Sequence, residues 1–117
     1  MTAQEAKQWE DHAAKFLAEK GYKIVKRNFR FGNVGEIDIV CYDDKTLVFV
    51  EVKARNNYVF GTPEESVDRR KQTQLKKVAR MYYSVNGLDD VECRFDVVAI
   101  DHLFGKTEVR HHMAAFY

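Results

Sequence analysis

Two neighbouring runs of alternating residues constrain the fold of this chain more than any other feature. Ile37–Asp43 and Leu47–Lys53 are rich in β-branched residues, and the polar pair Asp44 and Lys45 between them predicts an antiparallel hairpin. Both strands carry apolar residues on both faces, so we expect other elements to cover the sheet on both sides. Hydrophobic residues make up 45% of the 117 residues, which is enough for one compact core. We therefore expect a single domain spanning residues 1–117.

Two amphipathic segments predict helices that pack against this hairpin. Apolar residues recur at helical spacing within Ala3–Lys20. A second helix begins near Thr62 and Pro63, or as late as Asp68, and ends before Gly87.

Further strands are expected beside the hairpin. Tyr22–Phe31 and Arg94–Asp101 have the composition of strands, while Val109–Tyr117 fits either a strand or a closing helix. The long second helix crosses over between the third and fourth strands, a connection that suits parallel neighbours. The order of elements predicts an α/β fold with a mixed central β-sheet flanked by α-helices.

Charge, cysteines and the N-terminus exclude several classes of protein. The net charge of +1 provides no polycationic field, so any nucleic-acid binding has to come from local patches. Cys41 and Cys93 are too few for a disulfide scaffold or a four-ligand zinc site, and we expect both to be buried free thiols in a reducing compartment. No apolar targeting segment follows Met1, and Glu51 interrupts the longest apolar run. A soluble, cytoplasmic protein without membrane contact is expected.

The hairpin register brings four charged side chains together. If Asp44 and Lys45 form the tip, Asp38 lies opposite Glu51, and Glu36 lies opposite Lys53. All four would project to the same face, with facing Cβ atoms about 5 Å apart. A four-residue loop preserves this register, whereas a three-residue loop breaks it.

Carboxylates at one end of a doubly covered sheet favour a bound cation. They would be partly desolvated and would repel one another unless a positive charge neutralised them. Oxygen ligands favour Mg²⁺ or Mn²⁺ over zinc, and such an ion beside a lysine can polarise a phosphoryl oxygen and activate water. The pattern is equally compatible with ordinary cross-strand ion pairs, in which Asp38 and Glu51 pair with Lys53 and Arg55.

At these residues the chain resembles a known family. Gly35–Val40, a short hairpin and Phe49–Arg55 resemble the signature of PD-(D/E)XK nucleases. Nearly the whole sequence resembles the YraN family of bacterial endonuclease-like proteins, which are related to archaeal Holliday-junction resolvases. The residues that carry the wider resemblance include Trp9 and Glu10, Asn28, Phe29 and Arg30, Gly61, Lys71, Arg94–Val98, and Ala115 and Phe116. The chain has Trp9 where the family usually has glycine, and Ile37 where the superfamily's name has proline.

The resemblance implies a fold, an activity and a set of site residues. The fold would be restriction-endonuclease-like, and the activity would be metal-dependent hydrolysis of phosphodiester bonds in nucleic acid. DNA is the expected substrate, including branched DNA of the Holliday-junction kind, and a homodimer is the expected assembly. Asp38 and Glu51 would hold Mg²⁺ or Mn²⁺, with Glu10 completing the metal site, and Lys53 would be the catalytic lysine.

Basic residues around the second helix are the candidate contacts to phosphate. Lysine and arginine position nucleic acid by contacting its backbone, although an isolated run of charge is more often a solvated helix face. Lys71 and Gln72 are expected nearest the scissile phosphate. The residues assigned to nucleic-acid binding are Arg55, Arg69, Arg70, Lys71 and Gln72.

Two classes of function remain open. The first is the metal-dependent nuclease. The second is a nucleic-acid-binding or assembly module that keeps the nuclease fold without cleavage, which the near-neutral net charge favours. The presence of Asp38, Glu51 and Lys53 favours the enzyme, because a protein that only binds gains nothing from placing carboxylates against a phosphate backbone.

Overall fold

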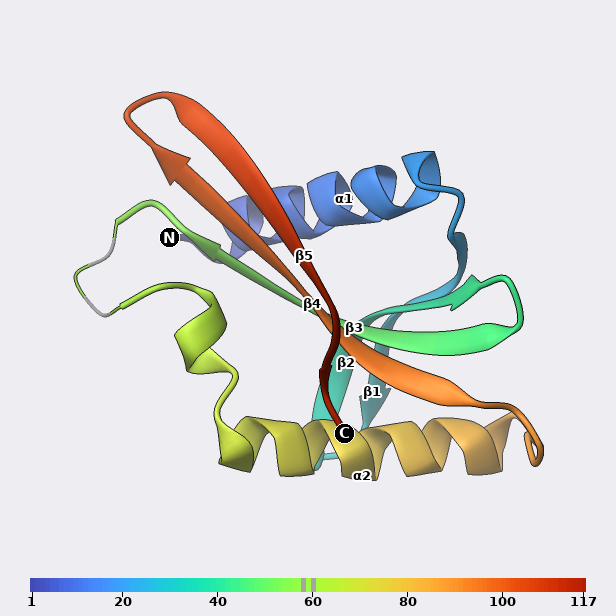
Figure 1. Ribbon diagram of the computed structural model, residues 1–117. Coiled ribbons are helices and arrows are strands. Elements are labelled where there is room, and N and C mark those ends of the chain that lie inside the picture. Colours follow the sequence, from blue (N-terminus) through green and yellow to red (C-terminus); the bar gives the residue numbers. More distant parts are fainter. Residues whose placement is uncertain (58, 60) are drawn as a thin grey trace.

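A five-stranded sheet lies between two helices in the computed structural model, which describes residues 1–57, 59 and 61–117 (Figure 1). The helices are α1, Ala3–Glu19, and α2, Arg69–Val85, and a short 3₁₀ turn, η1, spans Glu64–Ser66. The strands are β1, Lys23–Phe31, β2, Gly35–Asp43, β3, Thr46–Arg55, β4, Cys93–Leu103, and β5, Lys106–Phe116.

The strands lie side by side in the order in which they follow one another along the chain. Neighbouring strands are antiparallel except for β3 and β4, which are parallel and are joined by the crossover through α2. The predicted mixed sheet flanked by helices is confirmed, and its arrangement is consistent with a restriction-endonuclease-like fold. Because β3 and β4 are parallel, their carboxyl ends meet at the same edge of the sheet.

Each helix covers one face of the sheet (Figure 1). Alternation along the central strands sends Val48 and Val50 to the cluster around α1, and Phe49 to the cluster around α2. Ile37 departs from the expected alternation. It packs in the α2 cluster, whereas Ile39 packs in the α1 cluster. Residues two apart on β2 therefore face opposite sides of the sheet here, so the regular alternation of the strand is interrupted between them.

Side-chain caps define where both helices begin. The Thr2 hydroxyl accepts a hydrogen bond from the Glu5 N–H at 3.1 Å, and the Asp68 carboxylate accepts one from the Lys71 N–H at 2.9 Å. The later of the two starts expected for the second helix is therefore correct. Neither α1 nor α2 is long and apolar enough to cross a membrane, and no other helix in the described part of the chain is.

The two cysteines differ in exposure. Cys41 is buried as expected, and burial raises the pKa of its thiol to about 12. Cys93 is exposed, so the expectation that it is buried was wrong. It is the first residue of β4, and the buried part of this strand begins only two residues later, at Phe95.

Candidate metal centre

The candidate site lies where β2 and β3 separate. Their pairing runs from Asp43 and Thr46 to Ile39 and Val50, in the predicted register. The predicted continuation of this pairing, Asp38 with Glu51 and Glu36 with Lys53, is wrong, because within the described residues the β2–β3 ladder ends at Ile39.

A side chain replaces the next backbone partner at this point. The Val52 N–H donates a hydrogen bond to Oδ2 of Asp38 at 2.8 Å, so a carboxylate occupies the place of a ladder carbonyl. Strand β3 continues beside β4 as far as Arg55, while β2 continues beside β1. The divergence of the two strands leaves a pocket of about 350 Å³ at the end of β3.

The pocket gathers residues from four elements. Glu10 comes from α1, Glu36 and Asp38 from β2, Glu51, Lys53 and Arg55 from β3, and Lys71 from α2. The structure therefore brings Asp38, Glu51, Lys53 and Glu10 to one pocket, although the backbone pairs expected to do so are not formed.

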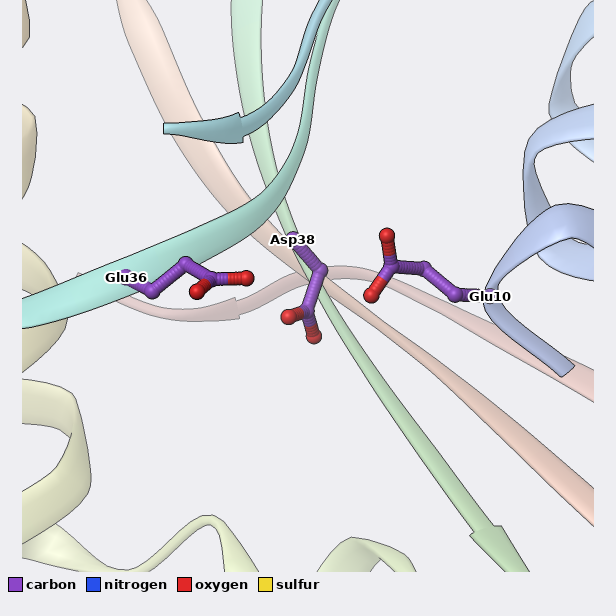
Figure 2. Close-up of side chains that lie close together, drawn as sticks. All are labelled: Glu10, Glu36 and Asp38. Atoms are coloured by element: carbon purple, nitrogen blue, oxygen red, sulfur yellow. The ribbon is translucent and has the colours of Figure 1, made fainter. Parts of the chain in front are cut away.

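Three of these carboxylates converge (Figure 2). One oxygen each from Glu10, Glu36 and Asp38 lies within 4.8 Å of the others. Glu10 and Glu36 approach from opposite sides, with Asp38 between them. The sequence pattern placed Glu36 on this face but did not assign it as a metal ligand. Glu36 lies two residues before Asp38, and residues two apart in a strand point to the same face, so this spacing was the signal in the sequence that Glu36 could belong to the site.

Asn28 joins two of these carboxylates, and sequence reasoning gave it no role in the site. Its Nδ2 atom donates to Oε1 of Glu10 and to Oε1 of Glu36, both at 2.7 Å. It lies opposite Asp38 in the register set by the flanking β1–β2 pairs and has a positive φ of 53°. Asparagine tolerates this backbone conformation better than most residues. An asparagine within a run of strand-forming residues was the only signal in the sequence.

The pocket disfavours the charged form of the Asp38 carboxyl group. Burial raises the pKa of its carboxyl group to about 9, and the hydrogen bond and negative charge of Glu51 act in the same direction. The Val52 N–H opposes this shift without overcoming it. A positive charge bound close to Asp38 would lower this pKa and favour the ionised form.

Glu51 is the most buried carboxylate of the pocket. Its side chain is 4% exposed, and its Oε2 atom lies 3.2 Å from Nζ of Lys71, which is an ion-pair distance. The two atoms lack hydrogen-bond geometry, and Oε2 accepts no hydrogen bond from any described residue. An acceptor oxygen thus remains available inside the pocket.

Lys53 supplies a positive charge that is not already paired. It is half-buried, it lines the pocket, and among the described residues it forms no ion pair. Arg55 also lines the pocket, and its guanidinium donates to its neighbour's carbonyl, that of Ala54, at 3.1 Å.

The other residues assigned to nucleic-acid binding fall in different places. Arg69 and Arg70 are exposed at the start of α2. Arg70 and Lys77 line a second hollow of about 610 Å³. Lys71 lines both this hollow and the acidic pocket. The structure does not bring Gln72 to the pocket, because its amide donates to the Val67 carbonyl at 3.0 Å.

The fold and the pocket together define a mixed α/β protein with an acidic centre at the diverging ends of two central strands. The family described as "Uncharacterised protein family UPF0102" matches residues 9–100, and the chain belongs to this family.

Three relatives illustrate the extent of the similarity. A UPF0102 protein of Natranaerobius thermophilus is 46% identical over 103 residues, covering 86% of this chain and 87% of the relative. One of Moorella thermoacetica is 49% identical over 88 residues, covering 75% and 72%. One of Syntrophomonas wolfei is 46% identical over 107 residues, covering 92% of each.

Proposed function

We propose that this protein is a Mg²⁺- or Mn²⁺-dependent nuclease that hydrolyses phosphodiester bonds in DNA, including branched DNA. The observation that carries the proposal is the convergence of Glu10, Glu36, Asp38 and Glu51 with Lys53 in one pocket. The resemblance to YraN proteins and to PD-(D/E)XK nucleases supports the same activity. Fold alone does not define function, so the argument depends on the pocket.

The donor set fits a hard divalent cation. Asp38 and Glu51 would hold it, with Glu10 and Glu36 close enough to Asp38 to contribute. Carboxylate oxygens are the ligands that Mg²⁺ and Mn²⁺ prefer. The raised pKa of Asp38 and the Oε2 atom of Glu51, which accepts no hydrogen bond from the described residues, are both features that a bound cation would satisfy. When bound, such an ion polarises a phosphoryl oxygen and makes water more acidic.

The chain's own cations would act on the phosphate. The Lys53 ammonium is unpaired among the described residues and can stabilise the negative charge that develops on the phosphate oxygens during hydrolysis. Lys71, which belongs to α2, offsets the charge of Glu51. Because Lys71 pairs with Glu51, Lys53 is left to interact with the substrate.

The basic hollow on α2 provides a path for the nucleic-acid backbone. Lys71 belongs to both the acidic pocket and this hollow, so the two are contiguous. Arg70 and Lys77 would contact phosphates on one side of the cleaved bond, which positions the nucleic acid without reading its sequence. Replacing Arg69 and Arg70 together is expected to weaken binding to all DNA sequences and to flatten its dependence on salt.

The test is a cleavage assay on labelled linear, flap and four-way-junction DNA with Mg²⁺, Mn²⁺ or EDTA. Asp38→Asn is expected to abolish cleavage and to leave DNA affinity unchanged or higher, because one negative charge is removed. Lys53→Ala is expected to slow cleavage by about 10²- to 10⁴-fold. The matched controls are Asp89→Asn and Lys45→Ala, which change the same charges at exposed positions outside the pocket.

The alternative is a nucleic-acid-binding or assembly module. The basic hollow on α2 favours it, because that surface can bind phosphates without the acidic pocket. DNA binding without a metal-dependent product on any substrate would support the module and contradict the nuclease. Light scattering with and without DNA tests the expected homodimer.

A further inference from the structure

The hairpin between β4 and β5 ends in an aromatic side chain that the described part of the chain leaves uncovered. Leu103 and Lys106 pair across a two-residue turn, and Phe104 within it is 101% exposed. Phe104 and Gly105 have positive φ angles of 52° and 74°. Turns of this kind favour asparagine followed by glycine, and a bulky residue with positive φ is strained. Folding stability therefore does not account for phenylalanine at this position.

The hairpin is held close to its turn, at the pair His102 and Thr107, which fixes the direction of the tip. The Trp9 ring on α1 lies against the His102 ring on β4, with centroids 5.2 Å apart. Nδ1 of His102 lies 2.9 Å from Oγ1 of Thr107 across the two strands. The ring contact ties the hairpin to the helix that supplies Glu10, and the contact between His102 and Thr107 joins the two strands of the hairpin.

The hairpin projects from the same end of the sheet as the acidic pocket. Arg55, which lines the pocket, is paired with Asp101 on the parallel strand β4. Phe104 follows Asp101 by three residues, which is about 10 Å along an extended strand. Figure 1 shows the hairpin extending past the carboxyl end of β3, on the side where α1 begins.

We propose that Phe104 stacks on an unpaired base of the DNA whose phosphate occupies the acidic pocket. This rests on the proposed function and deepens it, because it identifies the substrate as DNA with an exposed base face, as at a fork, flap or junction. The interior of a continuous duplex offers no such face. The exposed Lys106, which follows the turn, can contact a neighbouring phosphate.

The experiment compares two DNA probes of equal length, a forked DNA with unpaired bases at the branch and the fully paired duplex. Binding is measured by fluorescence anisotropy in EDTA, so that no strand is cut. Phe104→Ala is expected to weaken binding to the forked DNA by about 5- to 100-fold and to change duplex binding less than about twofold. Phe104→Trp is expected to retain the preference, because it keeps an aromatic face.

Two further variants separate recognition from structure. Phe104→Asn is expected to raise the melting temperature, since asparagine suits the turn, and to lower affinity for the forked DNA as the alanine variant does. Tyr117→Ala removes another exposed aromatic ring, 87% exposed at the end of the chain, and is expected to leave binding to both probes unchanged.

Several results would overturn the stacking role. Equal binding of forked DNA by Phe104→Ala and the parent would do so, as would an equal loss on forked and paired DNA. A change from dimer to monomer in Phe104→Ala without a change in DNA affinity would assign the ring to contact between two chains. Parent protein that cuts DNA but shows no dependence on Phe104 would leave the nuclease proposal standing and reject this one.

Discussion

Nζ of Lys71 lies 3.2 Å from Oε2 of Glu51, although Lys71 belongs to the first turn of α2 and Glu51 to the interior of the sheet. Lys71 therefore differs from its neighbours Arg69 and Arg70, which are exposed. The sequence pattern grouped the three as contacts to phosphate. The structure separates them, since Lys71 compensates a buried charge and the two arginines do not.

Replacing Lys71 should cost stability in a way that a metal ion corrects. Lys71→Met leaves Glu51 buried without its cation, and we expect a loss of roughly 2 kcal/mol in the free energy of unfolding. Arg70→Ala, the exposed control, should change it by less than about 0.5 kcal/mol. Urea denaturation in EDTA and in Mg²⁺ measures both, and the loss in Lys71→Met should shrink in Mg²⁺. Equal stability of the two variants in EDTA contradicts the role given to Lys71.

Asn28 offers a test of how the carboxylates are held together. Asn28→Gly keeps a residue that tolerates positive φ but removes the amide that bridges Glu10 and Glu36. Asn28→Asp instead places another carboxylate between them. We expect Asn28→Asp to have the lower melting temperature in EDTA and the larger rise on adding Mg²⁺ or Mn²⁺.

Differential scanning calorimetry at several metal concentrations checks this expectation. Asp89→Asn, an exposed acidic position, serves as the control. The same metal-induced shift in both Asn28 variants and in the parent would show that Asn28 does not influence the charge of the pocket.

Acid should unfold the protein partly through Glu64. Arg110 donates from Nε and Nη2 to its carboxylate at 2.6 and 2.8 Å, and these bonds lower its pKa to about 2 from an ordinary value of 4.5. Since the folded pKa is the lower one, the stabilisation is present above about pH 4.5 and is lost as the pH falls towards 2.

Glu64→Gln should flatten this part of the profile of unfolding free energy against pH. The loss at neutral pH is expected to be on the order of 2 kcal/mol, since hydrogen bonds to a charged group are removed. Exposed Glu19→Gln is the control. An unchanged acid limb in Glu64→Gln would mean that another carboxylate controls acid unfolding.

The two cysteines should differ in reactivity towards iodoacetamide. Cys93 is exposed, whereas Cys41 is buried and the pKa of its thiol is raised to about 12. Mass spectrometry of the native protein is expected to find one label per chain, on Cys93, and two after denaturation. Rapid labelling of Cys41 under native conditions would show that the core around β2 opens readily.

The central hairpin could be predicted because its alternation and its two-residue turn are local properties. Asp38, Glu51 and Lys53 do share one pocket as expected, although the register predicted to bring them there ends at Ile39 and Val50. The point where the strands separate could not be predicted, because it depends on the competition of one side chain with the backbone, the bond from Val52 to Asp38. The position of Gln72 was missed for a similar reason. Its amide bonds to Val67, whose placement depends on how η1 packs.

The bond between the Val52 N–H and Asp38 also affects how β3 exchanges its amide protons with solvent. A strand is usually protected only as far as its neighbour runs beside it. Here the row of amides that faces β2 continues beyond the last ladder pair, because a carboxylate shields the next one. The Val52 amide is thus a natural probe inside the pocket, since its exchange and its chemical shift follow the side chain to which it is bound.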